Sequence, residues 1–371
     1  MLEAEVEASG GEQEDSGEAD RAREEIRAVA AMGPSGEGDT GGPGTAREES
    51  LAMWNVAGMA MAPGSSAQSE SVAAKLDFLA AQLRAATGPM YLALSEVNGS
   101  RAAFKAAGGL SEWLAELGYA SEMATGMLSP DGMARGGVVL GWLDGVVRVI
   151  RPARTDSAGV TLTGTFRAPG HSADANVDIG VVYGRHRKGG ALRAVQLVSR
   201  MAATVNADRH RRGLVAAGDY NATPSESFQT ATRPRGKADE ALEILTGGGD
   251  GSAPSEAEVV PLGHDHAHGE FSRARWAGAG GARVGTSTID HALTAGSERG
   301  QWRMRARLFA TAHDQSPISD HEYIVLRRAA RSRDDAEDEG AEWRPPRHGH
   351  GSWRPATWAR FTAVAQAEAE R

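Results

Sequence analysis

The chain has 371 residues, of which 40% are hydrophobic and none is cysteine. This apolar content is enough for a sizeable buried core, and the lack of cysteine excludes disulfides, zinc-thiolate sites and thiol nucleophiles. Any metal must bind to oxygen or imidazole. No stretch approaches the ~20 apolar residues of a membrane span, and the N-terminus is acidic where a secretory signal would be basic and then apolar. We therefore predict a soluble intracellular protein of the nucleus or cytoplasm, with no membrane partner.

The net charge of −9 is concentrated at the N-terminus. Residues 1–50 contain 14 acidic side chains and four arginines, a net charge of −10, so the rest of the chain has a net charge of +1. Residues 1–48 also have too few large apolar side chains to offset the entropy cost of ordering. We predict that they form a disordered acidic tail that solubilises the chain. Mimicry of nucleic acid by this tail is the less common alternative.

From residue 50 the sequence alternates between strand and helix patterns. Short apolar runs predict strands, and apolar residues that recur on one helical face predict helices. Strands are predicted at 51–56, 91–94, 136–142, 146–150, 160–166, 177–183, 214–217, 287–293 and 322–326, and helices at 71–85, 110–114 and 191–206. Residues 245–286 are rich in glycine, histidine and serine and have little periodicity, so we predict a long loop there.

Polar residues stand at the ends of these strands. Each lies just inside or beyond an apolar run, where side chains can converge on one edge of a sheet. They are Asn55, Glu96, Asp219, Asn221, Asp290, Asp320 and His321. Taken singly, each has an ordinary structural interpretation, such as a turn former or a capping residue. Their order along the chain is the informative feature.

Six short motifs in this order resemble those of the endonuclease/exonuclease/phosphatase superfamily. That superfamily includes deoxyribonuclease I, exonuclease III and the endonuclease domains of non-LTR retrotransposons. The motifs are Trp54-Asn55-Val56-Ala57-Gly58, Leu94-Ser95-Glu96-Val97, Val181-Val182-Tyr183, Gly218-Asp219-Tyr220-Asn221, Thr288-Ile289-Asp290 and Ser319-Asp320-His321. The resemblance implies a four-layered α/β sandwich with two central mixed, mainly antiparallel sheets, built from residues 49–328.

The resemblance also implies a Mg²⁺-dependent phosphodiesterase, with Mn²⁺ as a substitute. Glu96 would be the principal metal ligand, supported by Asp320 and Asn55, because hard cations prefer oxygen ligands. Asn55 would contact the phosphate as well. Asp219 would orient and deprotonate the attacking water, and Asn221 would hold that water or the phosphate.

The remaining roles implied by the resemblance concern the phosphate oxygens. His321 would donate to a non-bridging oxygen, and Asp290 would fix its tautomer and favour the imidazolium. Tyr183 would help to bind the phosphate. No residue needs to be a covalent nucleophile.

Three basic segments bear on the substrate. The nuclease branch continues its tyrosine strand as Tyr-x-Pro-Asn, but here Gly184-Arg185-His186-Arg187-Lys188 follows Tyr183. Arg185 and Arg187 could bind nucleic-acid phosphates, with a solvated basic turn as an equal alternative. For Arg209-His210-Arg211-Arg212 we favour a structural role. For His264, His266 and His268 we favour simple exposure over a metal site.

A nucleic acid, with DNA ahead of RNA, fits the sequence best as substrate. Inositol phosphatases of the superfamily show a Cys-Asp-Arg element, and secreted sphingomyelinases have a signal sequence; this chain has neither. We therefore predict a DNA endonuclease. The alternatives are a phosphomonoesterase on a small or lipid phosphate and a non-catalytic nucleic-acid-binding relative.

The C-terminus adds a second feature of the retrotransposon type. Residues 329–352 are predicted to form a charged linker, and residues 353–371 a helical segment with an apolar stripe of Trp358, Phe361 and Val364. Non-LTR retrotransposon polyproteins carry a similar tryptophan-containing segment after the endonuclease. An ordinary docking helix is the alternative.

Overall fold

A computed structural model describes residues 48–59, 70–85, 88–128, 134–156, 160–169, 171–172, 175–185, 189–208, 212–224, 235–247, 255–262, 272–276, 283–311 and 317–329. Within these residues the chain forms two mixed sheets, one of eight strands and one of six. The first sheet contains β1 (Ser50–Asn55), β2 (Tyr91–Ser95), β3 (Tyr119–Leu128), β4 (Ala134–Leu143), β10 (Arg273–Trp276), β11 (Arg283–Ser287), β13 (Trp302–Thr311) and β14 (Pro317–Arg328).

The second sheet has the strand order β5-β6-β7-β8-β12-β9. Its strands are β5 (Arg148–Thr155), β6 (Thr161–Arg167), β7 (Val177–Tyr183), β8 (Gly213–Asp219), β9 (Glu258–Val259) and β12 (Asp290–Gly296). The described helices are α2 (Glu70–Arg84), α3 (Arg101–Lys105), α4 (Leu110–Glu116), α5 (Gly190–Ala207) and α6 (Lys237–Leu245). None of these helices is long and apolar enough to span a membrane.

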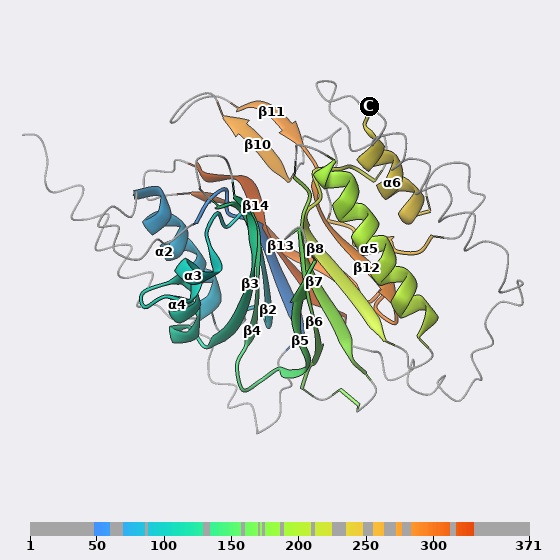
Figure 1. The fold of residues 1–371 in the computed structure, drawn as a ribbon, viewed down its shortest axis with the longest axis horizontal. Helices are drawn as coiled ribbons and strands as arrows, with labels where there is room; N and C mark the ends of the chain where they lie inside the picture. The colour runs from blue at the N-terminus through green and yellow to red at the C-terminus, as the bar shows by residue number, and fades with distance from the viewer. Residues whose placement is uncertain are drawn as a thin grey trace, which may run out of the picture. The chain divides into compact units, whose positions relative to one another are not determined.

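The elements stack in four layers. Figure 1 shows α2, α3 and α4 against the first sheet, and α5 with α6 on the outer side of the second sheet. One hydrophobic cluster fills the space between the sheets, with Leu94 and Val139 from the first and Val181 and Val215 from the second. The predicted four-layered sandwich with two mixed, mainly antiparallel sheets is therefore confirmed.

A second hydrophobic cluster attaches α5 to its sheet. Val195 and Val198 of α5 pack with Leu214 of β8 and Leu293 of β12, and all four side chains are fully buried. Burial of one such side chain contributes about 1.5–3 kcal/mol relative to its exposure. The helical spacing of apolar residues in 191–206 thus has a direct counterpart in the packing.

The strand directions bring the ends of several strands together. β1 is parallel to β2, with Asn55 opposite Ser95, and β7 is parallel to β8, with Tyr183 opposite Asp219. β12 is antiparallel to β8 and begins where β8 ends, so that Asp290 is opposite Asp219. The strand ends that carry the sequence motifs therefore meet at one edge of the sandwich.

The structure also corrects part of the sequence prediction. The single long loop predicted for residues 245–286 is wrong, because β9 and β10 lie within it and most of β11 does too. These strands are short, with Arg273 and Arg275 in β10 and a glycine in β11, so they lack a run of apolar residues. The sequence analysis also did not predict the helices α3 and α6 or the strands β3 and β13.

Several predictions fall outside the described residues. They concern the acidic tail up to residue 47, the basic residue Arg187, the three histidines His264, His266 and His268, and the C-terminal segment from residue 330 onward. Of the second basic cluster only Arg212 is described. It pairs with Asp178 at 2.6 Å and donates to Thr165 Oγ1 at 3.0 Å, the structural role that was favoured.

Candidate active site

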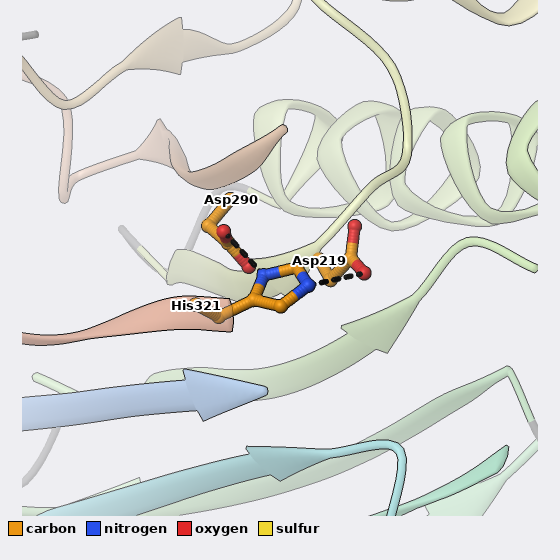
Figure 2. A group of neighbouring side chains, drawn as sticks. All are labelled: Asp219, Asp290 and His321. Atoms are coloured by element: carbon orange, nitrogen blue, oxygen red, sulfur yellow. Dashed lines mark hydrogen bonds and ion pairs between the residues drawn. The ribbon is translucent and has the colours of Figure 1, made fainter. Parts of the chain in front are cut away.

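A buried histidine–aspartate pair lies at the meeting point of β12 and β14. His321 Nδ1 is 2.8 Å from Asp290 Oδ2, and the two residues are 2% and 3% exposed. The carboxylate can only accept, so His321 presents a hydrogen on Nδ1 and turns Nε2 away from Asp290. Nε2 lies 4.0 Å from Asp219 Oδ2 (Figure 2). The pair therefore directs one ring nitrogen toward the end of β8.

Two serines hold this pair in place. Ser272 Oγ accepts hydrogen bonds from the backbone N–H groups of Ile289 and Asp290, both at 3.1 Å. Ser319 Oγ donates to Asn55 O at 2.8 Å and accepts from His321 N at 3.1 Å. The Ser-Asp-His motif thus uses its serine to join β14 to the end of β1.

Asp219 lies at the centre of an amide network. Asn221 N donates to Asp219 Oδ1 at 2.8 Å, while Asn221 Nδ2 donates to Asp219 Oδ2 at 3.0 Å and to Gly184 O at 2.5 Å. Asn55 Nδ2 donates to Asp219 Oδ2 at 2.9 Å and to Glu96 Oε2 at 3.1 Å. Each side-chain amide nitrogen carries two hydrogens. Asn55 donates both to carboxylates, and Asn221 donates one to a carboxylate and one to the Gly184 carbonyl.

Glu96 is held by unusual backbone geometry as well as by its neighbours. Its carboxylate accepts from Asn55 and is hydrogen-bonded to Tyr183. Four non-glycine residues of the described chain have a positive φ, and they are Ala57, Glu96, Asn98 and Asn221. This conformation costs about 1–3 kcal/mol per residue and concentrates at functional sites. Here all four residues lie in the turns that follow β1, β2 and β8.

Two cations not predicted from the sequence enter this region. Arg273 of β10 donates from Nε to Asp320 Oδ2 at 2.7 Å, next to His321. Lys75 of α2 is buried and donates from Nζ to Ala57 O and Gly58 O, each at 3.2 Å. Burial lowers the pKa of Lys75, although the charges of Asp320 and Glu96 oppose that shift.

The pKa shifts of Asp219 and His321 suit acid–base chemistry near neutral pH. Burial and the neighbouring Asp290 raise the pKa of Asp219 to about 7. Burial opposes the charge of His321, but its hydrogen bond and ion pair with Asp290 outweigh this and raise its pKa to about 9. His321 is therefore an imidazolium at neutral pH, next to a carboxylate that can accept a proton.

The donor set fits a hard divalent cation. Glu96, Asp219, Asp290 and Asp320 supply carboxylates within one hydrogen-bonded network, which disfavours charging all of them without a cation. Among the described residues, Asp219, Asp290 and His321 form a group whose ligand atoms lie within 4.8 Å of one another. Asp290 is already engaged by the imidazole of His321, so its carboxylate is less available to a cation.

The structure brings most of the predicted site residues together. Asn55, Glu96, Tyr183, Asp219, Asn221, Asp290 and His321 are joined by the contacts above, and Asp320 joins them through His321 Nε2 at 3.7 Å. Arg185 follows β7 and lies beside Tyr183, within the electrostatic reach of its hydroxyl. The sequence analysis missed Arg273, Lys75 and Ser272. None of them stands at the end of an apolar strand, so no signal in the sequence marked them.

Comparison with known proteins identifies the family. The family described as "Endonuclease/Exonuclease/phosphatase family" matches residues 54–321. The chain therefore belongs to the endonuclease/exonuclease/phosphatase family, whose members hydrolyse phosphodiester or phosphomonoester bonds and generally depend on divalent metals. No curated protein sequence matches the chain.

Solved structures of similar fold share little sequence with the chain. The human Nocturnin catalytic domain with bound sulfate has 15% identity and a TM-score of 0.48, covering 76% of this chain and 94% of Nocturnin. Humanized D. rerio TDP2 has 13% identity and a TM-score of 0.45, covering 76% and 98%. An endonuclease/exonuclease/phosphatase from Beutenbergia cavernae has 17% identity and a TM-score of 0.46, covering 76% and 72%.

Proposed function

We propose that this protein is a Mg²⁺-dependent endonuclease that cleaves DNA. The observation that carries the proposal is the position of His321 Nε2, which is held by Asp290 on one side and faces Asp219 on the other. Hydrolysis of a phosphodiester needs a proton acceptor for water and a donor for the phosphoryl oxygen. Asp219 and His321 provide both within one hydrogen-bonded network.

The residues act in the following way. Asp219 accepts the proton of the attacking water. Its Oδ1 is oriented by the backbone N–H of Asn221, and its Oδ2 by the side-chain amides of Asn221 and Asn55. His321 donates from Nε2 to a non-bridging oxygen as negative charge builds in the transition state. Tyr183, next to Glu96, helps to bind the phosphate.

The proposed metal site uses oxygen donors of three residues. Glu96 and Asp320 would hold the metal, with Asn55 in support, because hard cations prefer oxygen ligands and the carboxylate of Asp290 is already engaged by His321 Nδ1. When bound, the ion supplies charge stabilisation to the phosphoryl oxygens. Asp320 also has a cationic partner in Arg273. The guanidinium of Arg273 is therefore in a position to neutralise the phosphate beside the metal.

A polynucleotide is the substrate class favoured by the charges near the site. Arg185 follows Tyr183 and Arg273 lies beside Asp320, so two guanidinium groups flank the carboxylates. Arginine recognises phosphate through paired donors, and each contact adds salt-dependent affinity. DNA is proposed ahead of RNA because the motifs resemble those of a superfamily that includes deoxyribonuclease I and exonuclease III.

The test is cleavage of supercoiled plasmid by the full chain. We expect nicking with Mg²⁺ or Mn²⁺, complete loss in excess chelator, and loss in Asp219→Ala. RNA, abasic DNA, inositol phosphates and a phosphomonoester should be assayed in parallel. Cleavage that persists in chelator would contradict the metal assignment. Turnover of inositol phosphates without turnover of DNA would contradict the nuclease assignment.

A further inference from the structure

The edge strand of the second sheet carries three exposed arginines at regular intervals. β5 has the sequence Arg-Val-Ile-Arg-Pro-Ala-Arg-Thr, so that Arg148, Arg151 and Arg154 recur every third residue, and all three are exposed. In a regular strand this spacing would place successive arginines on opposite faces of the sheet, because side chains alternate with a period of two. We call these three residues the β5 arginine row.

Two irregularities in the pairing of β5 with β6 change that alternation. The register opposes Arg148 to Arg167, Arg151 to Thr165 and Arg154 to Thr163, with shifts between residues 149 and 151 and between residues 151 and 154. The partners on β6 are therefore two residues apart, and they point to the same side. Since directly opposed residues of antiparallel strands share a face, all three arginines lie on one face.

This face is the outer one, and the row lies beyond the helix that covers it. Thr163 is opposite Gly180 of β7, where an added Cβ would meet Met201 of α5, so the face looks toward α5. Helix α5 packs on β7, β8 and β12, as Figure 1 shows, and none of the described helices packs on the outer side of β5. The exposure of the arginines agrees with this position.

Within the described residues, no member of the row has a hydrogen-bond or ion-pair partner. The neighbouring acidic groups are already engaged. Asp178 pairs with Arg212 and accepts from Thr165, and Asp156 accepts from the backbone N–H groups of residues 160 and 161. Among the described residues, the row is therefore a concentration of positive charge without an acidic partner.

The row begins at the same end of the sheet as the active site. Thr155 is opposite Leu162, Thr161 is opposite Val182, and Tyr183 is opposite Asp219. Arg154 is opposite Thr163, Thr163 is opposite Gly180, and Gly180 is opposite Ala216. Arg154 is therefore three strands, about 14 Å, from β8, at a level three residues, about 10 Å, along β8 from Asp219. Arg148 lies at the distant end of the row.

We infer that the β5 arginine row binds alternate phosphates of a nucleic-acid strand that leaves the active site. The inference rests on the proposed function and deepens it, because it requires a polynucleotide that extends beyond the scissile phosphate. The β6 residues opposite the three arginines are two residues apart, which is about 6.8 Å along the strand. That is about twice the 3.4 Å rise per nucleotide along one strand of DNA, so a phosphate is available to every arginine.

Edge protection is the alternative explanation of this row. Charged side chains on an edge strand prevent sheets from pairing with one another, and Pro152 in the same strand has that effect too. Edge protection requires charge, but it requires neither one sign nor one face. It also predicts no effect of the arginines on nucleic-acid binding.

The test uses the full chain with Arg148→Gln/Arg151→Gln/Arg154→Gln. Its matched control, Arg84→Gln/Arg101→Gln/Lys105→Gln, removes three exposed charges from the helices over the other sheet. For a long oligonucleotide we expect the dependence of log Kd on log salt to flatten by about 2–3 in the row variant, since each phosphate contact contributes about 0.7–0.9. The control variant should keep the wild-type slope.

Three further measurements complete the test. The row variant should hydrolyse the small diester bis(p-nitrophenyl) phosphate at the wild-type rate, and it should bind a dinucleotide as the wild type does. A triple lysine variant should retain the salt dependence, which separates lost charge from a folding defect. An unchanged slope in the row variant, or competition by phosphatidylserine vesicles but not by oligonucleotides, would overturn the inference. If the wild type neither binds nor cleaves any nucleic acid, the proposed function itself fails.

Discussion

His321 depends on a residue from another strand for its proposed role. Asp290 fixes the ring and stabilises its charge, so the two residues should act as one unit. We expect His321→Ala to lower single-turnover cleavage by about 10²–10³-fold, with little change in DNA affinity, because its contact strengthens only in the transition state. Asp290→Asn should also lower the cleavage rate, and the double variant should cleave only a little more slowly than His321→Ala. Losses that simply add would contradict the coupling.

The pH profile provides a control for this coupling. The pKa of His321 is raised to about 9, so the donor is present at lower pH and is lost as the pH rises through about 9. The cleavage rate should therefore fall on that alkaline side. Asp290→Asn should move the fall to lower pH, because Asp290 raises the pKa, and His321→Gln should abolish it. A purely structural role for the pair would leave the profile unchanged.

Replacement of Arg273 should lower the stability of the metal-free protein and increase the stabilisation that Mg²⁺ provides. Its guanidinium pairs with Asp320, and the side chains are 18% and 28% exposed. We expect Arg273→Met to lower the free energy of unfolding in chelator by about 1–3 kcal/mol, since it leaves carboxylates without a counter-charge. Mg²⁺ should then raise the melting temperature more than it does in the wild type. Arg273→Lys is the matched control, and an equal Mg²⁺ response in all three proteins would contradict the prediction.

The sequence could mark the motif residues because each ends or begins an apolar strand. Asp219, Asp290 and His321 are separated by up to 102 residues, yet the order of their motifs was enough to predict a common site. Arg273 and Lys75 stand in no such position. Their partners are set by tertiary structure alone, for example the single pairing of Arg273 with His321 between β10 and β14.

At the level of elements, the end of β8 depends on a glycine. Gly218 has a φ of +142°, and a Cβ there would lie 2.2 Å from Val182 O on the neighbouring strand. Gly218→Ala should therefore open the β7–β8 pairing next to Asp219 and cost at least about 2 kcal/mol. Thermal unfolding would measure this loss. Gly145→Ala is the control, because its positive φ has the same sign but no atom lies within 4 Å of the added Cβ; equal losses would contradict the argument from close approach.

The strands that the sequence analysis did not predict differ in how clear a strand pattern their residues show. β13 alternates apolar residues with arginines in Trp-Arg-Met-Arg-Ala-Arg-Leu, which is a strand pattern that could have been recognised. β3 contains small and polar residues, and β10 is only four residues long. β10 forms through its pairing with β11 and β14. Such strands follow from the completed sheet and could not be predicted locally.

In the whole molecule, a buried charge cluster joins the two sheets at the end opposite the active site. Arg328 of β14 donates to both carboxylate oxygens of Glu298, at 2.9 and 3.0 Å, and Glu298 also accepts from Trp302. Glu49 lies 3.2 Å from His171 and accepts from Tyr91. These contacts stabilise the folded unit. We therefore expect that unit to begin at Glu49, the residue immediately before β1.

Truncation of the N-terminus tests where that unit begins. Deletion of residues 1–47 should leave the free energy of unfolding and the cleavage rate unchanged, because a polar acidic segment has no apolar face to add to the core. Deletion of residues 1–49 should cost about 1–3 kcal/mol, since it removes the Glu49 carboxylate from Tyr91 and His171 and the Glu49 carbonyl from Arg328 N, 2.8 Å away. Denaturant unfolding of the two truncations and the full chain measures both effects. A large loss in the shorter deletion would move the boundary toward the N-terminus, and no loss in the longer one would show that the cluster is stable without Glu49.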